Sequence, residues 1–187
     1  APKGHYQARA PGARILQGPD YALLRKEFHA YADWRREIAT VGRKVLVTTG
    51  GAGPAKSTED IMQALEQVEV EGLEVAVVIG AATKRVATLE EMARTSRLSL
   101  RLLRDPPNMA EWMAWADIAI SAAGSTVWEL AFMGLPGFSF VLAENQRQNA
   151  SEMQSSGILH ECSIEDFRHP REVGPRIACL LGSVVER

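Results

Sequence analysis

The chain has 187 residues, of which 46% are hydrophobic and 24% charged, and its formal net charge is -2 at pH 7. This length suits one domain with a sizeable core, or one domain plus a short extension, and the composition is that of an ordinary globular protein. The weak charge offers no surface for nucleic acid or an anionic membrane, and no apolar run approaches the roughly 20 residues that span a bilayer.

The hydrophobic pattern alternates between helix and strand along most of the chain. Apolar residues at helical spacing after Pro19 predict an amphipathic helix that extends to about Ile38. Short runs rich in β-branched residues predict six strands, at residues 44–51, 73–80, 98–103, 117–121, 137–142 and 158–162. Helices are predicted at residues 57–68, 88–95, 108–116, 126–133, about 145–156 and 173–181. The pairs Ser57/Asp60 and Thr88/Glu91 have the spacing of capping boxes.

This alternation predicts βαβ units that form a doubly wound parallel sheet, with helices on both faces. The commonest order for six such strands is 3-2-1-4-5-6, in which strands 1 and 4 are neighbours where the winding reverses. Ligands of such sheets bind in the crevice beyond the carboxyl ends of these two strands. The loops that leave them are Gly50-Gly51 and Ala123-Gly124-Ser125. The sequence therefore predicts a site for a phosphorylated ligand between these two loops.

The first loop contains three glycines, at positions 50, 51 and 53. Glycines let backbone amides approach a phosphate, although a strand-to-helix turn that needs positive φ would favour them as well. Two known phosphate-binding signatures do not match this loop. Ala55 stands at the position of the last glycine of a P-loop, and Lys56 stands at the position of the third glycine of the dinucleotide fingerprint. No later strand ends in an aspartate suited to magnesium, and the sequence predicts no cofactor and no metal site.

The second loop joins the fourth strand to a helix. Gly124 allows close approach, Ser125 and Thr126 offer hydroxyl groups, and the start of the helix supplies unpaired N–H groups. Glu129 has two interpretations: it completes a capping box with Thr126, or its carboxylate accepts two hydroxyl protons from a ribose. Spacing alone favours the cap.

Asn145 and Gln146 follow the fifth strand, beyond the same edge of the sheet. Their carboxamides both donate and accept hydrogen bonds, which suits sugar hydroxyls and phosphates. The alternative is a polar helix start with Asn145 as its N-cap.

None of the four histidines is a candidate catalytic base. His29, His160 and His169 have no partner placed by the sequence, and His5 lies in the first residues of the chain. No Ser/His/Asp arrangement and no pair of carboxylates appears. The sequence therefore predicts binding residues and no catalytic residue.

The cysteines and the first residues indicate the compartment and the boundaries. Cys162 and Cys179 form neither a disulfide framework nor a metal-ligand spacing, and no signal peptide is present, so we expect a cytoplasmic protein. The chain starts at Ala1, without methionine, in a basic stretch with proline and glycine. We interpret residues 1–16 as a linker or the remnant of a missing N-terminal domain, and residues 17–187 as the binding domain.

Several segments resemble one family. They are residues 16–28 (LQGPDYALLRKEF), the Thr-Gly-Gly turn, residues 116–131 (ADIAISAAGSTVWELA) and residues 144–146 (ENQ). They resemble the UDP-sugar hydrolase of pseudaminic-acid biosynthesis (UDP-diacetamido-trideoxy-altropyranose hydrolase), which is related in fold to the lipid II-forming N-acetylglucosaminyltransferase. That family has the two-domain GT-B architecture, and the resemblance covers its second domain only. The GPxYALLR segment is specific to the hydrolase, whereas related glycosyltransferases share GSTxxEL.

The resemblance implies that residues 17–187 bind UDP or a UDP-sugar. Gly51 and its neighbours, Gly50 among them, would face the pyrophosphate or the sugar, and residues 124–126 would hold the pyrophosphate. Glu129 would bind the uridine ribose, which reverses the preference for a cap alone.

The remaining contacts carried over by the resemblance concern the base and the sugar. Backbone near Leu103 and Arg104, after the third strand, would face uracil. Asn145 and Gln146 would reach the sugar.

The resemblance also implies a catalytic base that this chain lacks. The family's proposed base is a histidine in a glycine-rich loop of the first domain, and the segment around His5 does not reproduce that loop. The intact enzyme would deprotonate a water that attacks the anomeric carbon and expels UDP. The alternatives are the donor-binding half of a GT-B glycosyltransferase, a non-catalytic nucleotide-sugar-binding module and, more distantly, a P-loop nucleotidase.

Overall fold

The structure is a computed structural model that describes residues 10, 12–16, 18–37, 39–50 and 55–182. Most of the predicted linker (1–9 and 11), and with it His5, lies outside the described residues. The same holds for Gly51 and Gly53 of the first glycine loop and for Ile38.

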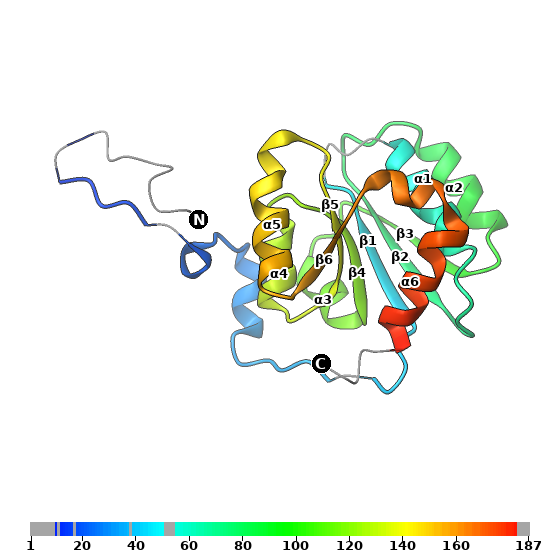
Figure 1. The fold of residues 1–187 in the computed structure, drawn as a ribbon, viewed down its shortest axis with the longest axis horizontal. Helices are drawn as coiled ribbons and strands as arrows, with labels where there is room; N and C mark the ends of the chain where they lie inside the picture. The colour runs from blue at the N-terminus through cyan, green and yellow to red at the C-terminus, as the bar shows by residue number, and fades with distance from the viewer. Residues whose placement is uncertain (1–9, 11, 17, 38, 51–54, 183–187) are drawn as a thin grey trace.

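A six-stranded parallel sheet forms the centre of the described chain (Figure 1). Its order is β3-β2-β1-β4-β5-β6, which confirms the predicted order, and all neighbouring strands are parallel. The strands are β1 (Lys44–Thr48), β2 (Glu74–Ile79), β3 (Ser99–Arg104), β4 (Ile118–Ala122), β5 (Gly137–Phe140) and β6 (Leu159–Cys162). The predicted doubly wound α/β fold is therefore confirmed.

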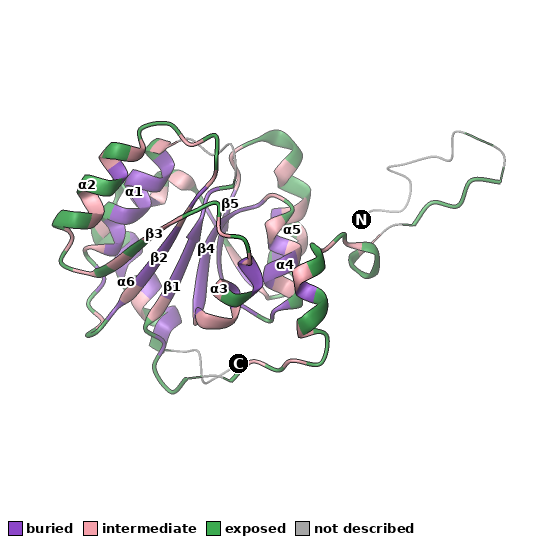
Figure 2. Cartoon of the chain, turned by 180° about the vertical axis from the view of Figure 1, so that it is seen from behind, coloured by how far each residue is buried: buried purple, intermediate pink, exposed green. Residues whose placement is uncertain are grey.

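Helices cover both faces of the sheet (Figure 1). One face packs against α1 (Ala55–Leu65), α2 (Val86–Thr95) and α6 (Pro170–Gly182), and the other against α3 (Met109–Trp115), α4 (Thr126–Phe132) and α5 (Arg147–Ser155). Side chains alternate between the two faces: Val45 and Val47 belong to the first core, and Leu46 to the second. Because both faces are covered, β1 and β4 are buried almost throughout (Figure 2), and their sequences are mostly apolar.

The first predicted helix is wrong. Residues 19–31 instead form two 3-10 helices, η1 (Pro19–Tyr21) and η2 (Lys26–Tyr31), with extended backbone at Ala22 and Arg25 between them. Among the apolar residues that suggested a helix, Phe28 is fully buried, whereas Leu24 is only partly buried against the α3–α5 core. The apolar residues of this segment contact the layer of α3, α4 and α5 individually and do not form one continuous helical face. An irregular segment can place apolar residues at this spacing as well as a helix can.

Two predicted capping boxes are also wrong. The helices α1 and α2 begin at Ala55 and Val86, each two residues before the expected caps at Ser57 and Thr88. Both cap candidates therefore lie inside their helices. The residue before α2 is Arg85, whose φ of 62° is left-handed and which makes no side-chain cap bond.

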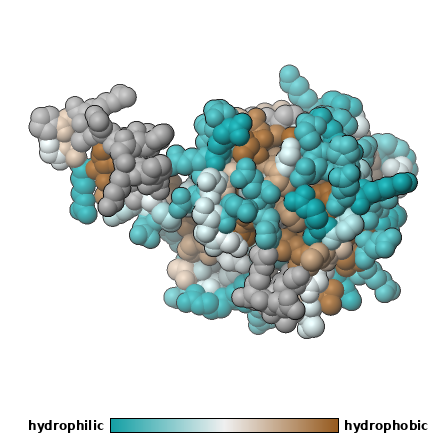
Figure 3. Space-filling model, viewed as in Figure 1, coloured by the Kyte–Doolittle hydropathy of each residue, from teal (hydrophilic) through white to brown (hydrophobic). Residues whose placement is uncertain are grey.

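The surface seen in Figure 3 is mostly hydrophilic, and hydrophobic residues show between the hydrophilic ones in limited areas. Within the described residues, no helix is long and apolar enough to cross a membrane.

Candidate functional site

The ends of β1 and β4 lie side by side at the carboxyl edge of the sheet. Thr48, the last residue of β1, pairs with Ser121 of β4, one residue before that strand ends. The loops that leave these two strands therefore start next to each other, as the sequence predicts. Gly50 has a φ of 82°, and an added Cβ there would meet no atom within 4 Å. Backbone conformation, and not lack of space, is what requires glycine at this position.

A buried hydrogen bond supports the base of the first loop. The hydroxyl groups of Thr49 and Thr58 lie 3.0 Å apart, and both residues are buried. Thr49 follows β1 and Thr58 lies in the first turns of α1, so this bond joins the two ends of the glycine loop. The sequence offered no motif for this pair.

The second loop leaves open space above its glycine. A Cβ added to Gly124 would find its nearest neighbour, Nε2 of Gln146, at 3.9 Å, and the backbone there is not left-handed. Nothing in the described chain therefore demands glycine at this position. Ser125 is exposed and serves as N-cap without a side-chain bond, so its hydroxyl makes no cap to the helix.

Glu129 does not form the predicted capping box, because α4 has no side-chain cap bond at its N-cap. Its carboxylate instead accepts two hydrogen bonds from Arg25, at 2.7 Å from Nε to Oε1 and 2.8 Å from Nη2 to Oε2. The side chain of Glu129 is 8% exposed and that of Arg25 is 46% exposed. The hydrogen bond to Glu129 is the main reason that the pKa of Arg25 lies above its ordinary value.

Residues after β5 reach back to the second loop. Oε1 of Gln146 accepts a hydrogen bond from the backbone N–H of Leu142 (2.9 Å). The other end of the same carboxamide, Nε2, faces Gly124. Asn149 donates through Nδ2 to the carbonyl oxygens of Ala123 (3.2 Å) and Gly124 (3.3 Å). Asn149 is not among the residues predicted for the site, although its carboxamide lies in the same polar run as Asn145 and Gln146.

Asn145 is exposed and is not the predicted N-cap. Residues Glu144–Gln146 form the 3-10 helix η3, and α5 begins after it at Arg147. The N-cap of α5 is Gln146, which makes no side-chain cap bond.

Leu103 and Arg104 end β3, two strands away from β1. Leu103 is half-buried, and the exposed Arg104 forms an ion pair with Glu90 of α2 at 2.5 Å. The structure thus brings together Gly50, residues 124–126, Glu129 and Gln146 at one edge, but it directs the Arg104 side chain toward α2.

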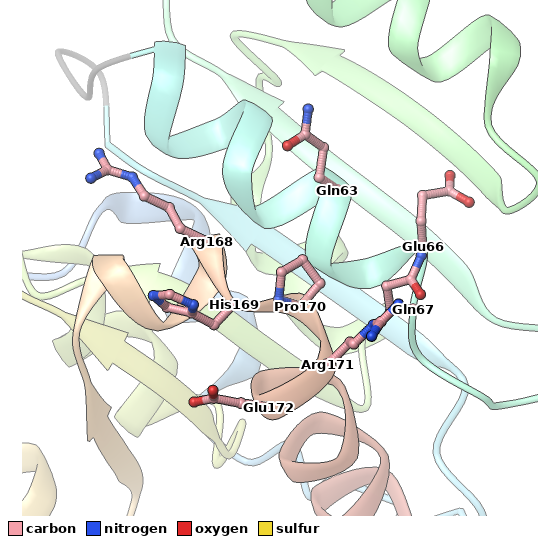
Figure 4. A pocket seen from close by; sticks show the side chains of 8 residues that line it. All are labelled: Gln63, Glu66, Gln67, Arg168, His169, Pro170, Arg171 and Glu172. Carbon is pink, nitrogen blue, oxygen red and sulfur yellow. The ribbon is translucent and has the colours of Figure 1, made fainter.

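None of the described histidines lies in the loops after β1, β4 or β5. His29 is in η2, His160 in β6, and His169 follows the 3-10 helix η4 (Ile164–Arg168). His169 lines a hollow of about 680 Å³ between the second half of α1 and the start of α6 (Figure 4), which no predicted site residue lines. Across the described parts of the chain, no group of three or more His, Cys, Asp or Glu side chains is placed to hold a metal ion.

The carboxyl edge thus offers hydroxyl groups, carboxamides, backbone amides and three buried carboxylates, Glu59, Asp60 and Glu129, each of which is paired with a cationic side chain. These groups suit recognition of phosphates and hydroxyls.

Comparisons with known proteins agree with this architecture. The chain is 27% identical over 158 residues to the spore coat polysaccharide biosynthesis protein SpsG of Bacillus subtilis (strain 168), a match that covers 82% of this chain and 45% of SpsG. Among solved structures, Acinetobacter baumannii MurG has a TM-score of 0.57 at 19% identity, with 88% of this chain and 49% of MurG covered. Arabidopsis thaliana UGT89C1, solved in complex with UDP-L-rhamnose, has a TM-score of 0.53 at 16% identity, with 86% and 38% covered.

The chain spans about half the length, or less, of these three proteins. The structural likeness shows a shared fold, the Rossmann-like C-terminal half of GT-B glycosyltransferases. The sequence model of the glycosyltransferase family 28 C-terminal domain matches residues 45–163, which is more than half of the chain. The chain therefore belongs to the glycosyltransferase family 28 C-terminal domain family.

Proposed function

We propose that this domain binds the nucleoside diphosphate part of a UDP-sugar in the crevice between β1 and β4, as the donor-binding half of a GT-B glycosyltransferase-like protein. The observation that carries the proposal is the pair of turns at neighbouring strand ends: Gly50 in a left-handed conformation, and Gly124 beneath open space that the chain does not fill. The family match and the similar structure solved with UDP-L-rhamnose support the same ligand class.

The diphosphate would bind between the two turns. Glycine backbone lets N–H groups approach phosphate oxygens closely, and the hydroxyl groups of Ser125 and Thr126 would add donors. The Nε2 group of Gln146, close to Gly124, would supply a further donor. Gly51 belongs to the proposed site as a neighbour of Gly50.

The rest of the ligand would extend to either side of the diphosphate. Glu129 would accept hydrogen bonds from the ribose, and backbone at Leu103 and Arg104 would face uracil. The exposed carboxamide of Asn145 would reach the sugar.

A UDP-sugar hydrolase of the pseudaminic-acid type is the second candidate. One contact favours it: the GPxYALLR segment that resembles the hydrolase places its arginine, Arg25, on Glu129 at the candidate site. Hydrolysis and transfer share UDP as leaving group, so the described half would serve either reaction. The family match and SpsG favour the transferase-like alternative.

Calorimetric titration of the chain with UDP and UMP, with and without a chelator, tests the proposal. UDP should bind at least about ten-fold more tightly than UMP, because a second phosphate adds charged hydrogen bonds that contribute roughly 1.5–3 kcal/mol each. The chelator should have no effect, since the proposed contacts involve no metal. Equal affinities for UDP and UMP would contradict a diphosphate site, and loss of binding with the chelator would contradict metal-free recognition.

A further inference from the structure

We propose that Arg25 is a positioning residue for ribose recognition: its guanidinium orients the Glu129 carboxylate, neutralises it beside the diphosphate, and leaves both of its oxygens able to accept from a vicinal diol. This inference rests on the proposed function. It assigns a task to a residue that lies outside the matched family domain (45–163).

The geometry is that of a two-point fork. Nε and Nη2 of Arg25 donate to different oxygens of Glu129, at 2.7 and 2.8 Å. A fork of this kind fixes the plane of the carboxylate, which a single hydrogen bond would leave free to rotate. The partners are 104 positions apart in the sequence, so the contact depends on the tertiary fold.

Arg25 is itself held in place by its own segment. Its guanidinium lies over the ring of Phe28, 5.6 Å from the centroid, and Nη1 lies 3.4 Å from Glu27. Phe28 is fully buried and packs edge-on against Phe132 of α4, with ring centroids 6.2 Å apart. The segment is thus anchored on the same helix that carries Glu129.

The lone pairs of a carboxylate permit a second set of partners. An ionised carboxylate has about four acceptor positions on its two oxygens, and a bidentate arginine uses one on each. The other position on each oxygen remains for a hydroxyl, which matches the two hydroxyl groups of a ribose.

Charge gives a second reason for the arginine. A carboxylate as buried as Glu129 is costly without a partner, and a diphosphate nearby would repel it. The Arg25 cation offsets both effects and holds the carboxylate toward the ligand. Without this cation, the carboxylate would turn away from the diphosphate.

The test measures ribose recognition and stability separately, by titrating the chain with UDP and 2′,3′-dideoxy-UDP. We expect the unsubstituted chain to prefer UDP, and Arg25→Gln to weaken UDP binding at least about ten-fold, the factor that corresponds to about 1.4 kcal/mol. The ratio of the two affinities should fall toward one, because the variant loses recognition of the diol. Arg25→Lys keeps the charge but cannot form the two-point fork. Its UDP affinity should therefore lie between that of the unsubstituted chain and that of Arg25→Gln.

Arg36→Gln is the matched control. Arg36 belongs to the same N-terminal segment, and it donates to the carbonyls of Met113, Ala116 and Met133 at the opposite edge of the sheet. Its loss should lower the melting temperature and leave the preference for UDP over the dideoxy ligand unchanged.

Three results would overturn the inference. If Arg25→Gln lowers the melting temperature with UDP affinity unchanged, the pair is a structural contact only. If Arg25→Gln or Arg25→Lys binds UDP more tightly, the arginine competes with the ribose. If the unsubstituted chain binds no UDP, the proposed function fails and this inference fails with it, an outcome visible before any variant is made.

Discussion

Thr49 and Thr58 hold the two ends of the first glycine loop together through one buried hydrogen bond of 3.0 Å between their hydroxyl groups. Each hydroxyl is the other's partner, and the residues are 5% and 3% exposed, so water cannot easily replace either one. This relationship ties the stability of the domain to the geometry of the loop that contains Gly50.

Replacing one member of this pair should cost more than replacing both. Thr49→Val or Thr58→Val leaves one buried hydroxyl without a partner, and we expect the free energy of unfolding to fall by about 1–3 kcal/mol. The double variant removes both polar groups while keeping their shape, so its stability should return toward that of the unsubstituted chain. Urea denaturation measures all three. Additive losses in the double variant would mean that the hydroxyls do not depend on each other.

Three glycines should respond differently to alanine. At Gly124 an alanine fits the chain, so stability should change by less than about 0.5 kcal/mol while UDP binding weakens, since the methyl group enters the space proposed for the diphosphate. At Gly50 the φ of 82° should cost roughly 1–2 kcal/mol of stability. At Gly137 a Cβ would lie 1.9 Å from the carbonyl oxygen of Ala119, which should prevent normal folding. Thermal unfolding and UDP titration separate these outcomes, and normal UDP affinity in Gly124→Ala would refute its proposed role.

The chain by itself should not release UDP from UDP-linked diacetamido-sugars at an enzymatic rate. Attack on an anomeric carbon needs a base within about 3 Å of the proton that it removes, and no described histidine lies in the loops after β1, β4 or β5. Three carboxylates are buried in the first turns of α1 and α4, and each has a cationic partner: Glu59 pairs with Arg85, Asp60 with Lys56, and Glu129 with Arg25. A coupled assay for UDP, run with and without a supplied N-terminal half, measures this. Sustained turnover by the chain alone, abolished by one histidine substitution, would show that the catalytic group lies within it.

Cys162 should resist alkylation in the folded chain. Burial raises the pKa of its thiol to about 12, from an ordinary value of 9.0, so at pH 8 the reactive thiolate is scarce and the sulfur is enclosed. Because the unfolded thiol ionises first as pH rises, this group contributes stability that is complete below pH 9 and is lost as the pH approaches about 12. Mass spectrometry after iodoacetamide treatment should find Cys162 unmodified in the native chain and modified in urea. Equal labelling in both conditions would contradict the burial.

The sheet was predictable because its signal is local. Runs such as residues 45–47 are apolar on both faces, and the glycines that follow β1, β2 and β4 mark where those strands end. Given parallel strands and right-handed crossovers, these runs lead to the observed strand order. Gly50 and Gly124 followed from the same reasoning, because topology alone places the ends of β1 and β4 together.

The contacts that complete the site were not predictable, because they join distant segments. Arg25 and Glu129 are 104 positions apart, and Asn149 reaches Gly124 across 25. The capping boxes failed for a related reason. A Ser or Thr followed three residues later by Asp or Glu occurs inside helices as well as at their starts. Only the backbone conformation shows that α1 begins at Ala55.

The N-terminal segment is attached at both edges of the sheet. Arg25 donates hydrogen bonds to Glu129 at the carboxyl edge, and Arg36 donates hydrogen bonds to backbone carbonyls at the amino edge. Residues 26–35 therefore have to bridge a fixed distance along α4. A surface segment normally tolerates insertions and deletions, but this one should not. Adding or removing a residue between the two arginines would move one of them out of reach of its partner, so the length of this segment is as constrained as the length of a strand in the sheet.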